Sequence, residues 1–412
     1  MGRSRRSKRK RATTCPVAGA DDDADRVTAL PLELRARIAS LLDFRQVVQL
    51  SALSKPWRDV HLHAPAVEIH LHEFLRHQHL YFDEVHKVPG ILDEGAILGA
   101  RVSLARRAQA QVGSKVDTLR LGYVADDVRM RRHAGRIMAL ADAREIHVLA
   151  PSRDEEVRGA WTLDLPPAAR DLEIRARAHL VPAIAGPGAA ALQMLRLDKV
   201  VLGEWPRLPS LRFLSLDDVT VEAPFAPGAW CPLLEELVAD SCKVLHPRVD
   251  IRLPHLKFLD LEEFDVRPRG HSDGPPFGEI TIDAPELAEL DVDASPWNTV
   301  DFKSFTLRAP RLKRLWWHHQ FAERVRIDVG EPGSVEEGWI ELMSVYSREI
   351  KYYDEQMMQM LAGLLPDVPP ESIADVTRPY RTRVKYTEVE DGEVTTEEKI
   401  TCDLRALMSR GT

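Results

Sequence analysis

Hydrophobic residues recur in a six-residue frame along the middle of the chain. The frame reads L-x-x-L-x-L, and its nine copies start at residues 116, 143, 169, 192, 211, 234, 256, 287 and 312. Its apolar fourth and sixth positions alternate with other residues as in a half-buried strand. The starts are 19 to 31 residues apart, which is typical of repeats that bury a continuous core only by stacking on their neighbours. The pattern predicts a solenoid over residues 116–330.

Three short amphipathic segments precede the repeats, within residues 26–65. Pro31 suits the first position of a helix, and Asp43 can cap a second one. Ser54 opens a third segment, which carries Trp57. The apolar residues of the first two segments fall at helical spacing: Leu34, Ile38, Leu41, Val47, Leu50 and Leu53. Helices this short cannot bury their apolar stripes among themselves, so we expect another protein to cover part of this surface.

The segments on either side of the repeats show other patterns. Residues 66–115 are predicted to hold a linker strand and a helix that cap the solenoid. In residues 331–412, apolar positions from 350 to 364 run at helical spacing, and the chain turns polar from Arg381. We therefore expect a helical C-terminal cap followed by a polar tail.

Composition argues against a membrane-spanning protein and against a secreted, disulfide-rich protein. Of 412 residues, 44% are hydrophobic and 29% charged, and the formal net charge is −8. The longest uncharged run, 178–195, is interrupted by proline and glycine, so no membrane span is predicted. The four cysteines are scattered and no apolar secretory segment opens the chain, which indicates a reducing compartment, the nucleus and/or the cytoplasm.

The N-terminus carries a charged run. Its first eleven residues hold seven basic side chains, and four aspartates follow by residue 25. Residues 1–25 are predicted to be a disordered tail, and the basic cluster is either a nuclear-import signal or a solvated charge run. No basic stripe with interleaved aromatic residues follows, so we expect no nucleic-acid partner.

Two motifs in residues 26–65 carry a resemblance to a known family. The sequence L-P-L-E-L at 30–34 and the sequence L-S-K-P-W-R at 53–58 together resemble the F-box, which joins substrate receptors to SCF-type ubiquitin ligases. The irregular frame that follows resembles the leucine-rich repeats of plant F-box/leucine-rich-repeat proteins, although the Asn or Cys that usually follows each strand is mostly missing. The resemblance implies an α/β fold: a three-helix F-box, an irregular leucine-rich-repeat solenoid with a curved parallel sheet, and a helical C-terminal cap.

The same resemblance implies a non-enzymatic function. The chain would be the substrate-recognition subunit of an SCF-type cullin–RING E3 ubiquitin ligase, with the F-box bound to a Skp-type adaptor and the repeats bound to a target protein. Adaptor contacts are expected from Leu30, Pro31, Leu34, Ile38, Leu41, Leu42, Val47, Val48, Leu53 and Trp57. One alternative is a leucine-rich-repeat interaction scaffold without a ubiquitin ligase role, and another is a hydrolase or transferase in the C-terminal block.

The frame also predicts which side chains face outward. Positions three and five of the frame, and the residue directly after it, which we number seven, alternate in direction with the buried leucines. These residues therefore line the exposed, concave sheet. In the copies that start at 234, 256 and 287 these positions hold seven carboxylates and no basic residue. The predicted target contacts are Phe213, Glu236, Asp240, Phe258, Asp260, Glu262, Glu289, Asp291, Asp293 and Trp316. They form either an acidic trough with aromatic anchors for a basic segment of the target, or an ordinary solvated strand face.

Sequence motifs for chemistry are weak throughout. Seven histidines lie between residues 61 and 86, but they have no cysteine nearby and no helical pair four residues apart, as a zinc site would need. No phosphate-binding loop follows the glycines near residue 186, and no nucleophile, base and orienting acid can be assembled from spacing. We predict no metal, no cofactor and no catalytic residue.

Overall fold

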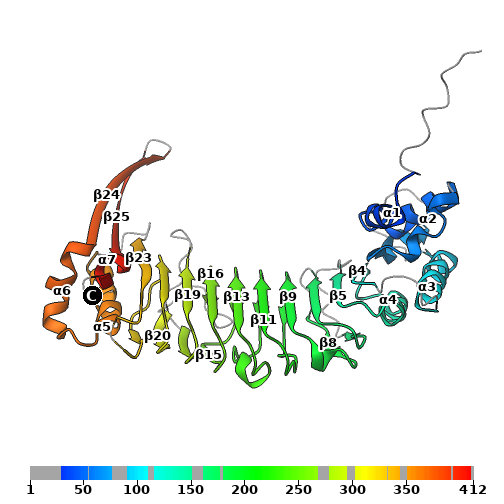
Figure 1. Cartoon of the computed structure of the whole chain (residues 1–412). Coiled ribbons are helices and arrows are strands. Elements are labelled where there is room, and N and C mark those ends of the chain that lie inside the picture. Colours follow the sequence, from blue (N-terminus) through cyan, green and yellow to red (C-terminus); the bar gives the residue numbers. More distant parts are fainter. Residues whose placement is uncertain are drawn as a thin grey trace, which may run out of the picture.

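The protein is an elongated solenoid with a small helical bundle at its N-terminal end and helices with a β-hairpin at its C-terminal end (Figure 1). The computed structural model describes residues 29–53, 55–76, 91–109, 116–150, 161–176, 180–267, 278–294, 302–331, 333–343, 350–390 and 393–409. The mixed α/β architecture with stacked parallel strands confirms the predicted fold class.

One long sheet runs the length of the solenoid. Its parallel strands follow in chain order: β1 (Ala66–His70), β4 (Thr118–Gly122), β5 (Glu145–Leu149), β7 (Asp171–Arg175), β9 (Met194–Asp198), β11 (Phe213–Asp217), β13 (Glu236–Asp240), β16 (Phe258–Glu262), β19 (Glu289–Asp293), β21 (Arg314–His318) and β23 (Glu337–Met343). Equivalent frame positions of neighbouring strands from β4 to β21 are paired in register. The repeat frame therefore sets both the strands and their alignment.

The core follows the same frame. The first, fourth and sixth residues of all nine copies are buried, and none is more than 4% exposed. The frame also continues past both predicted ends, with Ala64 as a first position before β1 and Val335 before β23. The frame thus extends beyond the predicted bounds 116–330, and Gly338 stands at a fourth position where the other copies hold Leu, Ile or Val.

A repeated turn follows the strand in five of the copies. Its first residue has a positive φ of 45° to 57° at Lys199, Asp218, Ser241, Glu263 and His319. The N–H of each donates to the carbonyl of the residue directly after the six-residue frame in the next strand, as from Lys199 to Asp217 and from Glu263 to Asp293. Since the neighbouring strand satisfies this N–H, the turn holds without the side chain of the asparagine that the sequence lacks.

Return segments bring the chain back behind the long sheet. Near the N-terminal end they include α3 (Glu94–Gln109) and α4 (Val128–Ala141), with short strands β2 (Leu75–Arg76) and β3 (Ile91–Leu92) before α3. Further along they are strands: β6 (Thr162–Asp164), β8 (Ala183–Ala185), β10 (Val201–Leu202), β12 (Thr220–Val221), β14 (Lys243–Val244), β17 (Asp265–Val266), β15 (Arg248–Arg252), β18 (Gly278–Asp283), β20 (Phe302–Arg308) and β22 (Val325–Asp328). The helix predicted in residues 66–115 is thus the first return segment.

The N-terminal bundle, residues 29–65, contains α1 (Leu32–Ala39) and α2 (Phe44–Leu53). Asp43 caps α2 as predicted, since its Oδ1 accepts the N–H of Gln46 while the Gln46 Oε1 accepts the N–H of Asp43. The predicted third helix is wrong: the chain forms two 3₁₀ turns there, Lys55–Trp57 and Val60–Leu62.

The C-terminal block closes the solenoid differently from the prediction. Helices α5 (Ile350–Leu364), α6 (Pro370–Thr377) and α7 (Leu404–Met408) form the predicted cap. The predicted polar tail is instead a long hairpin of β24 (Arg381–Glu390) and β25 (Glu393–Asp403), and β25 pairs antiparallel with β23. Threonine and valine favour strands, and the hairpin bonds satisfy the backbone where few apolar side chains are available.

Helix α5 seals the end of the return sheet with side-chain amides. The Gln356 Oε1 accepts the N–H of Ala322, and the Gln359 Oε1 accepts the N–H of Val325, each at 2.8 Å. Met357 and Met360 on the same helix are fully buried. The methionine stripe therefore fills the core, and the two glutamines take the place of a further strand.

Candidate protein-interaction surfaces

An apolar groove lies beside α1 in the N-terminal bundle. It has a volume of about 380 Å³ and is lined by Leu30, Leu34, Arg37, Ile38, Ser40 and Leu41. Leu41 is 82% exposed and Leu34 is 45% exposed. Four residues predicted to contact an adaptor thus come together around one open groove: Leu30, Leu34, Ile38 and Leu41.

The other predicted adaptor contacts are dispersed. Pro31 is exposed at the start of α1, Leu42 is half-buried, and Val48 is 45% exposed on another face of the bundle. The side chain of Leu53 lies outside the described residues. The groove beside α1 is therefore the compact part of the predicted set.

Val47 and Trp57 require a correction. They are only 5% and 4% exposed and pack with Ala39, Val60 and Ala64 in a small core of the bundle. The Ser51 hydroxyl donates to the carbonyl of Val47, which holds this region of α2 together. Trp57 ends the first 3₁₀ turn and Val47 lies on α2, and together they fill the interior of the bundle, so these two side chains support the groove and offer little surface to a partner.

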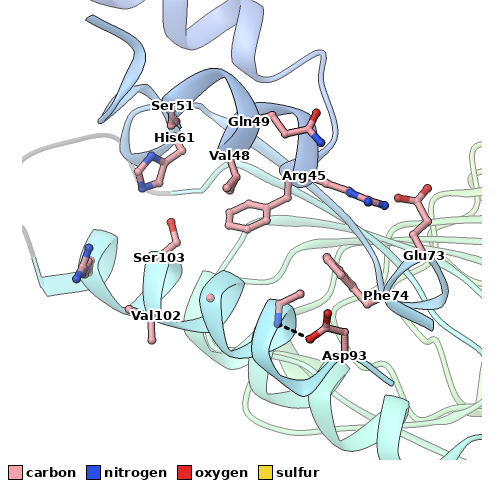
Figure 2. A pocket seen from close by; sticks show the side chains of 14 residues that line it. Arg45, Val48, Gln49, Ser51, His61, Glu73, Phe74, Asp93, Val102 and Ser103 are labelled. Carbon is pink, nitrogen blue, oxygen red and sulfur yellow. Dashed lines mark hydrogen bonds between the residues drawn. The ribbon is translucent and has the colours of Figure 1, made fainter. Parts of the chain in front are cut away.

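A larger cavity, of about 840 Å³, separates α2 from α3 (Figure 2). Phe44 and Val48 line it from α2. Ser103 lines it from α3, and Figure 2 shows Ser103 on the side of the cavity opposite Val48. Burial lowers the pKa of His61 at its rim. This cavity was not predicted from the sequence, although the spacing of Phe44, Val48 and Ser51 along one helix face could have indicated it.

The outward face of the long sheet carries the predicted target contacts in three in-register rows. One outer row holds Phe213, Glu236, Phe258, Glu289 and Arg314; the middle row holds Ser215, Val238, Asp260, Asp291 and Trp316; the other outer row holds Asp217, Asp240, Glu262, Asp293 and His318. All ten predicted target contacts lie on this face, and each is half-buried or exposed. We call the carboxylates of β13, β16 and β19 the acidic strip.

Mutual repulsion marks the centre of the acidic strip. Burial and the nearby carboxylates of Asp291 and Glu262 raise the pKa of Asp260 to about 6. Burial and nearby carboxylates also raise the pKa of Glu262. Carboxylates that repel one another in this way favour a cationic partner, because its charge removes the repulsion.

Cations from β21 neutralise one side of the acidic strip. Arg314 forms an ion pair with Glu289, and the Nδ1 of His318 lies 3.5 Å from the Oδ2 of Asp293. The hydrogen bond to Asp293 raises the pKa of His318. At the other end, the guanidinium of Arg196 lies over the ring of Phe213, 5.2 Å from its centroid. The uncompensated charge is therefore concentrated on β13 and β16 and at Asp291.

Trp339 lies beside Trp316 on the outward face of the long sheet. The two residues are register partners on β21 and β23, and both are half-buried. Trp339 was not among the predicted contacts because β23 was assigned to the C-terminal cap. The alternation Trp-Ile-Glu-Leu over 339–342 is the strand signal that could have found it.

Comparison with curated proteins gives a plant relative. A protein of Arabidopsis thaliana described as an F-box/LRR-repeat protein is 26% identical over 274 residues, which cover 64% of this chain. The chain is similar to a plant F-box/LRR-repeat protein. The resemblance predicted from its sequence is confirmed, and the match spans 50% of the relative's length. No family model matches the chain, and no solved structure does.

Three further properties concern the part of the chain that the structure describes. No group of three or more His, Cys, Asp or Glu side chains there could hold a metal ion. None of the described helices is both long and apolar enough to cross a membrane. Cys231, Cys242 and Cys402 are free and buried, and burial raises the pKa of each thiol to about 12.

Proposed function

We propose that the protein is the substrate-recognition subunit of an SCF-type cullin–RING E3 ubiquitin ligase. Its N-terminal bundle would bind a Skp-type adaptor, and the outward face of the long sheet would bind a target protein. Catalysis would come from the ligase, because the receptor would act only by holding the target near the ubiquitin-loaded enzyme. The resemblance to an F-box/LRR-repeat protein supports this division of labour.

The observation that carries the proposal is the open groove beside α1. Leu41 leaves 82% of its surface exposed although it belongs to a bundle with very little core of its own. Exposed apolar side chains gathered around a groove indicate a surface that a partner covers. Arg37 and Ser40 line the same groove, so it also offers polar contacts at its edge.

Co-purification with the adaptor tests this proposal. The full chain, expressed with a Skp-type adaptor and a cullin, should retain the adaptor, and a Leu30→Ala/Pro31→Ala double variant should lose it. Truncated hot spots cost about 2 kcal/mol or more each, so we expect adaptor affinity to fall by several hundred-fold or more. The matched control is Leu98→Ala, which alters a leucine that is 54% exposed on α3. An interaction scaffold without a ligase role would show no adaptor in either case.

Target recognition is the second part of the proposal. The acidic strip would attract a basic segment, with Phe213, Phe258 and Trp316 supplying apolar contact. A triple charge reversal at Asp260, Glu289 and Asp291 should abolish recovery of targets from cells treated with a proteasome inhibitor, while adaptor binding stays intact. Unchanged target recovery from that variant would contradict the role of the strip. The basic cluster of residues 1–11 supports a nuclear as well as a cytoplasmic location.

A further inference from the structure

Two tryptophans and three carboxylates occupy successive positions in one row across the end of the long sheet. The row runs Asp260, Asp291, Trp316, Trp339, Asp403, with each residue the register partner of the next. We propose that Trp316 and Trp339 form a platform for an arginine side chain of the target, held between Asp291 and Asp403. This inference deepens the target-binding part of the proposed function and rests on it.

The surroundings of the platform favour a cation. The Trp316 and Trp339 side chains are half-buried on the outward face, so their rings remain accessible. The faces of tryptophan rings attract cations through their quadrupole, more strongly than those of other aromatic residues. Asp291 is the register partner at one end of the pair and adds direct charge attraction for a side chain placed on the rings. At the other end Asp403 adds its charge, while its Oδ1 accepts the N–H of Ala406 as the cap of α7.

Asp291 supplies a hydrogen-bond acceptor next to the platform. Its Oδ1 is buried and accepts no hydrogen bond from the described residues. Burial also raises the pKa of this carboxyl group, because its charged form is poorly solvated there. A cation brought in by a partner would meet the accessible part of this half-buried carboxylate, and its charge would offset the poor solvation of the buried oxygen.

The neighbouring cations do not occupy the platform. Arg314 and His318 flank Trp316 along β21, and each is held by a carboxylate on β19, Glu289 and Asp293. On β23, the Trp339 Nε1 donates to Glu341, which also pairs with Lys399 at 2.5 Å. These pairs fix the rim, and the two rings stay open between them.

Arginine fits this arrangement better than lysine. A guanidinium is planar and can stack on an indole while donating two hydrogen bonds to one carboxylate, whereas an ammonium is a strongly hydrated point charge. In an extended segment, every second side chain projects to the same face at about 6.6 Å. Strands lie about 4.8 Å apart, so a second basic residue two positions on would lie over Asp291, with Asp260 on the next strand. The geometry favours a segment of the form Arg-x-Arg.

Binding of short peptides to the full chain tests the platform. The probe is a fluorescein-labelled peptide Gly-Ser-Arg-Gly-Arg-Gly-Ser, compared with counterparts in which lysine or glutamine replaces both arginines. Fluorescence anisotropy should show wild-type protein preferring the arginine peptide over the lysine peptide by about five-fold or more, the range of a desolvated cation–π contact. The glutamine peptide should not bind.

Variants separate the rings from the charges. Trp316→Leu and Trp339→Leu should each weaken the arginine peptide by about ten-fold and remove the preference over lysine. Asp291→Asn should weaken both basic peptides. The matched control is Asp250→Asn, on β15 of the return sheet, which should change neither. Equal affinity for arginine and lysine peptides in the wild type, or an unchanged preference in both tryptophan variants, would overturn the proposal.

Adaptor capture by the same proteins keeps the two proposals apart. All variants should retain the adaptor, because the groove beside α1 is unaltered; retention also confirms that each protein is folded at that end. Loss of arginine preference with adaptor retained would support the platform. A wild-type chain that captures the adaptor but binds no arginine peptide would refute the platform alone, and one that binds the peptide without capturing any adaptor would refute the ligase role alone.

Discussion

Asp260 and Asp291 are register partners on β16 and β19, and neither forms an ion pair with any described residue. Burial and the carboxylates of Asp291, Glu262, Asp240 and Asp293 raise the pKa of Asp260 to about 6. The folded protein thus holds a proton on Asp260 at pH values where the unfolded chain, with an ordinary pKa near 3.8, has lost it. Repulsion at this point is a cost of folding at neutral pH.

Removing the Asp260 charge should therefore stabilise the protein in a pH-dependent way. Because the folded pKa exceeds the unfolded one, Asp260 contributes most stability below about pH 4, and this contribution is lost as the pH rises through about 6. Asp260→Asn should raise the melting temperature by about 1–2 °C at pH 7.5, a modest shift because solvent screens the site, and should change it little at pH 4. Thermal unfolding followed by circular dichroism at both values measures this.

The control for that measurement is Asp250→Asn, in which the altered carboxylate pairs with Arg252 on β15. We expect no comparable gain at neutral pH from this variant. A gain of equal size at both pH values for Asp260→Asn would show that repulsion within the acidic strip is not its cause.

The groove and the core of the N-terminal bundle should respond differently to mutation. Leu41→Asp alters a side chain that is 82% exposed, so it should leave the melting temperature unchanged while weakening adaptor binding by about 30-fold or more. Trp57→Ala should instead destabilise the bundle by about 3–5 kcal/mol, because it empties the core. Surface plasmon resonance and hydrogen exchange of residues 29–65 distinguish the two effects. Strong adaptor binding by Leu41→Asp would exclude the groove as the contact.

Much of the solenoid could be predicted from its sequence because one frame fixes strand, register and core together. Leu214, Leu237 and Leu259 occupy equivalent positions and are buried side by side. The repeat was not recognised where an unusual residue occupies a frame position, as Gly338 does in β23. The hairpin of β24 and β25 was not predicted because its strands carry few apolar residues. The structure of this hairpin is set by hydrogen bonds between backbone groups, which any residue type can form and which the amino-acid composition therefore does not reveal.

The position of side chains was easier to predict on the sheet face than in the N-terminal bundle. The sheet face followed from alternation alone, and all ten residues predicted to contact a target lie on it. Burial in the N-terminal bundle could not be read from helical spacing, because Val47 and Leu34 both lie on apolar stripes but only Val47 is enclosed. Which side of a short helix is covered depends on the 3₁₀ turns that follow it, and the sequence suggested a helix in their place.

Cysteine reactivity offers a direct check of the core. Cys231, Cys242 and Cys402 are buried, and burial raises the pKa of each thiol to about 12, so almost no thiolate forms at pH 8. In the native protein, iodoacetamide at pH 8 should leave these three unmodified over an hour, while the protein in 6 M guanidinium chloride is fully alkylated. Peptide mass spectrometry identifies each site. Rapid native labelling of Cys242 would show that the middle of the solenoid opens readily.

The contact between α5 and β22 depends on a glycine. A Cβ at Gly363 would lie 2.3 Å from the carbonyl oxygen of Ile327 and 2.8 Å from its Cβ, so helix and strand would have to separate. Separation would stretch the bonds from Gln356 and Gln359 that close the return sheet. Gly363→Ala should therefore destabilise the protein by about 1–3 kcal/mol, despite the better helix propensity of alanine.

Gly135→Ala in α4 is the matched control, because a Cβ there meets no atom within 4 Å. With open space around it, alanine should stabilise α4 by about 0.5–1 kcal/mol. Urea unfolding measures both variants on the same scale. Opposite signs for the two substitutions would show that close packing of α5 on the last return strand, rather than helix propensity, sets the stability of this end. A stabilising Gly363→Ala would mean that α5 can move away from Ile327 without loss and that the solenoid does not need this seal.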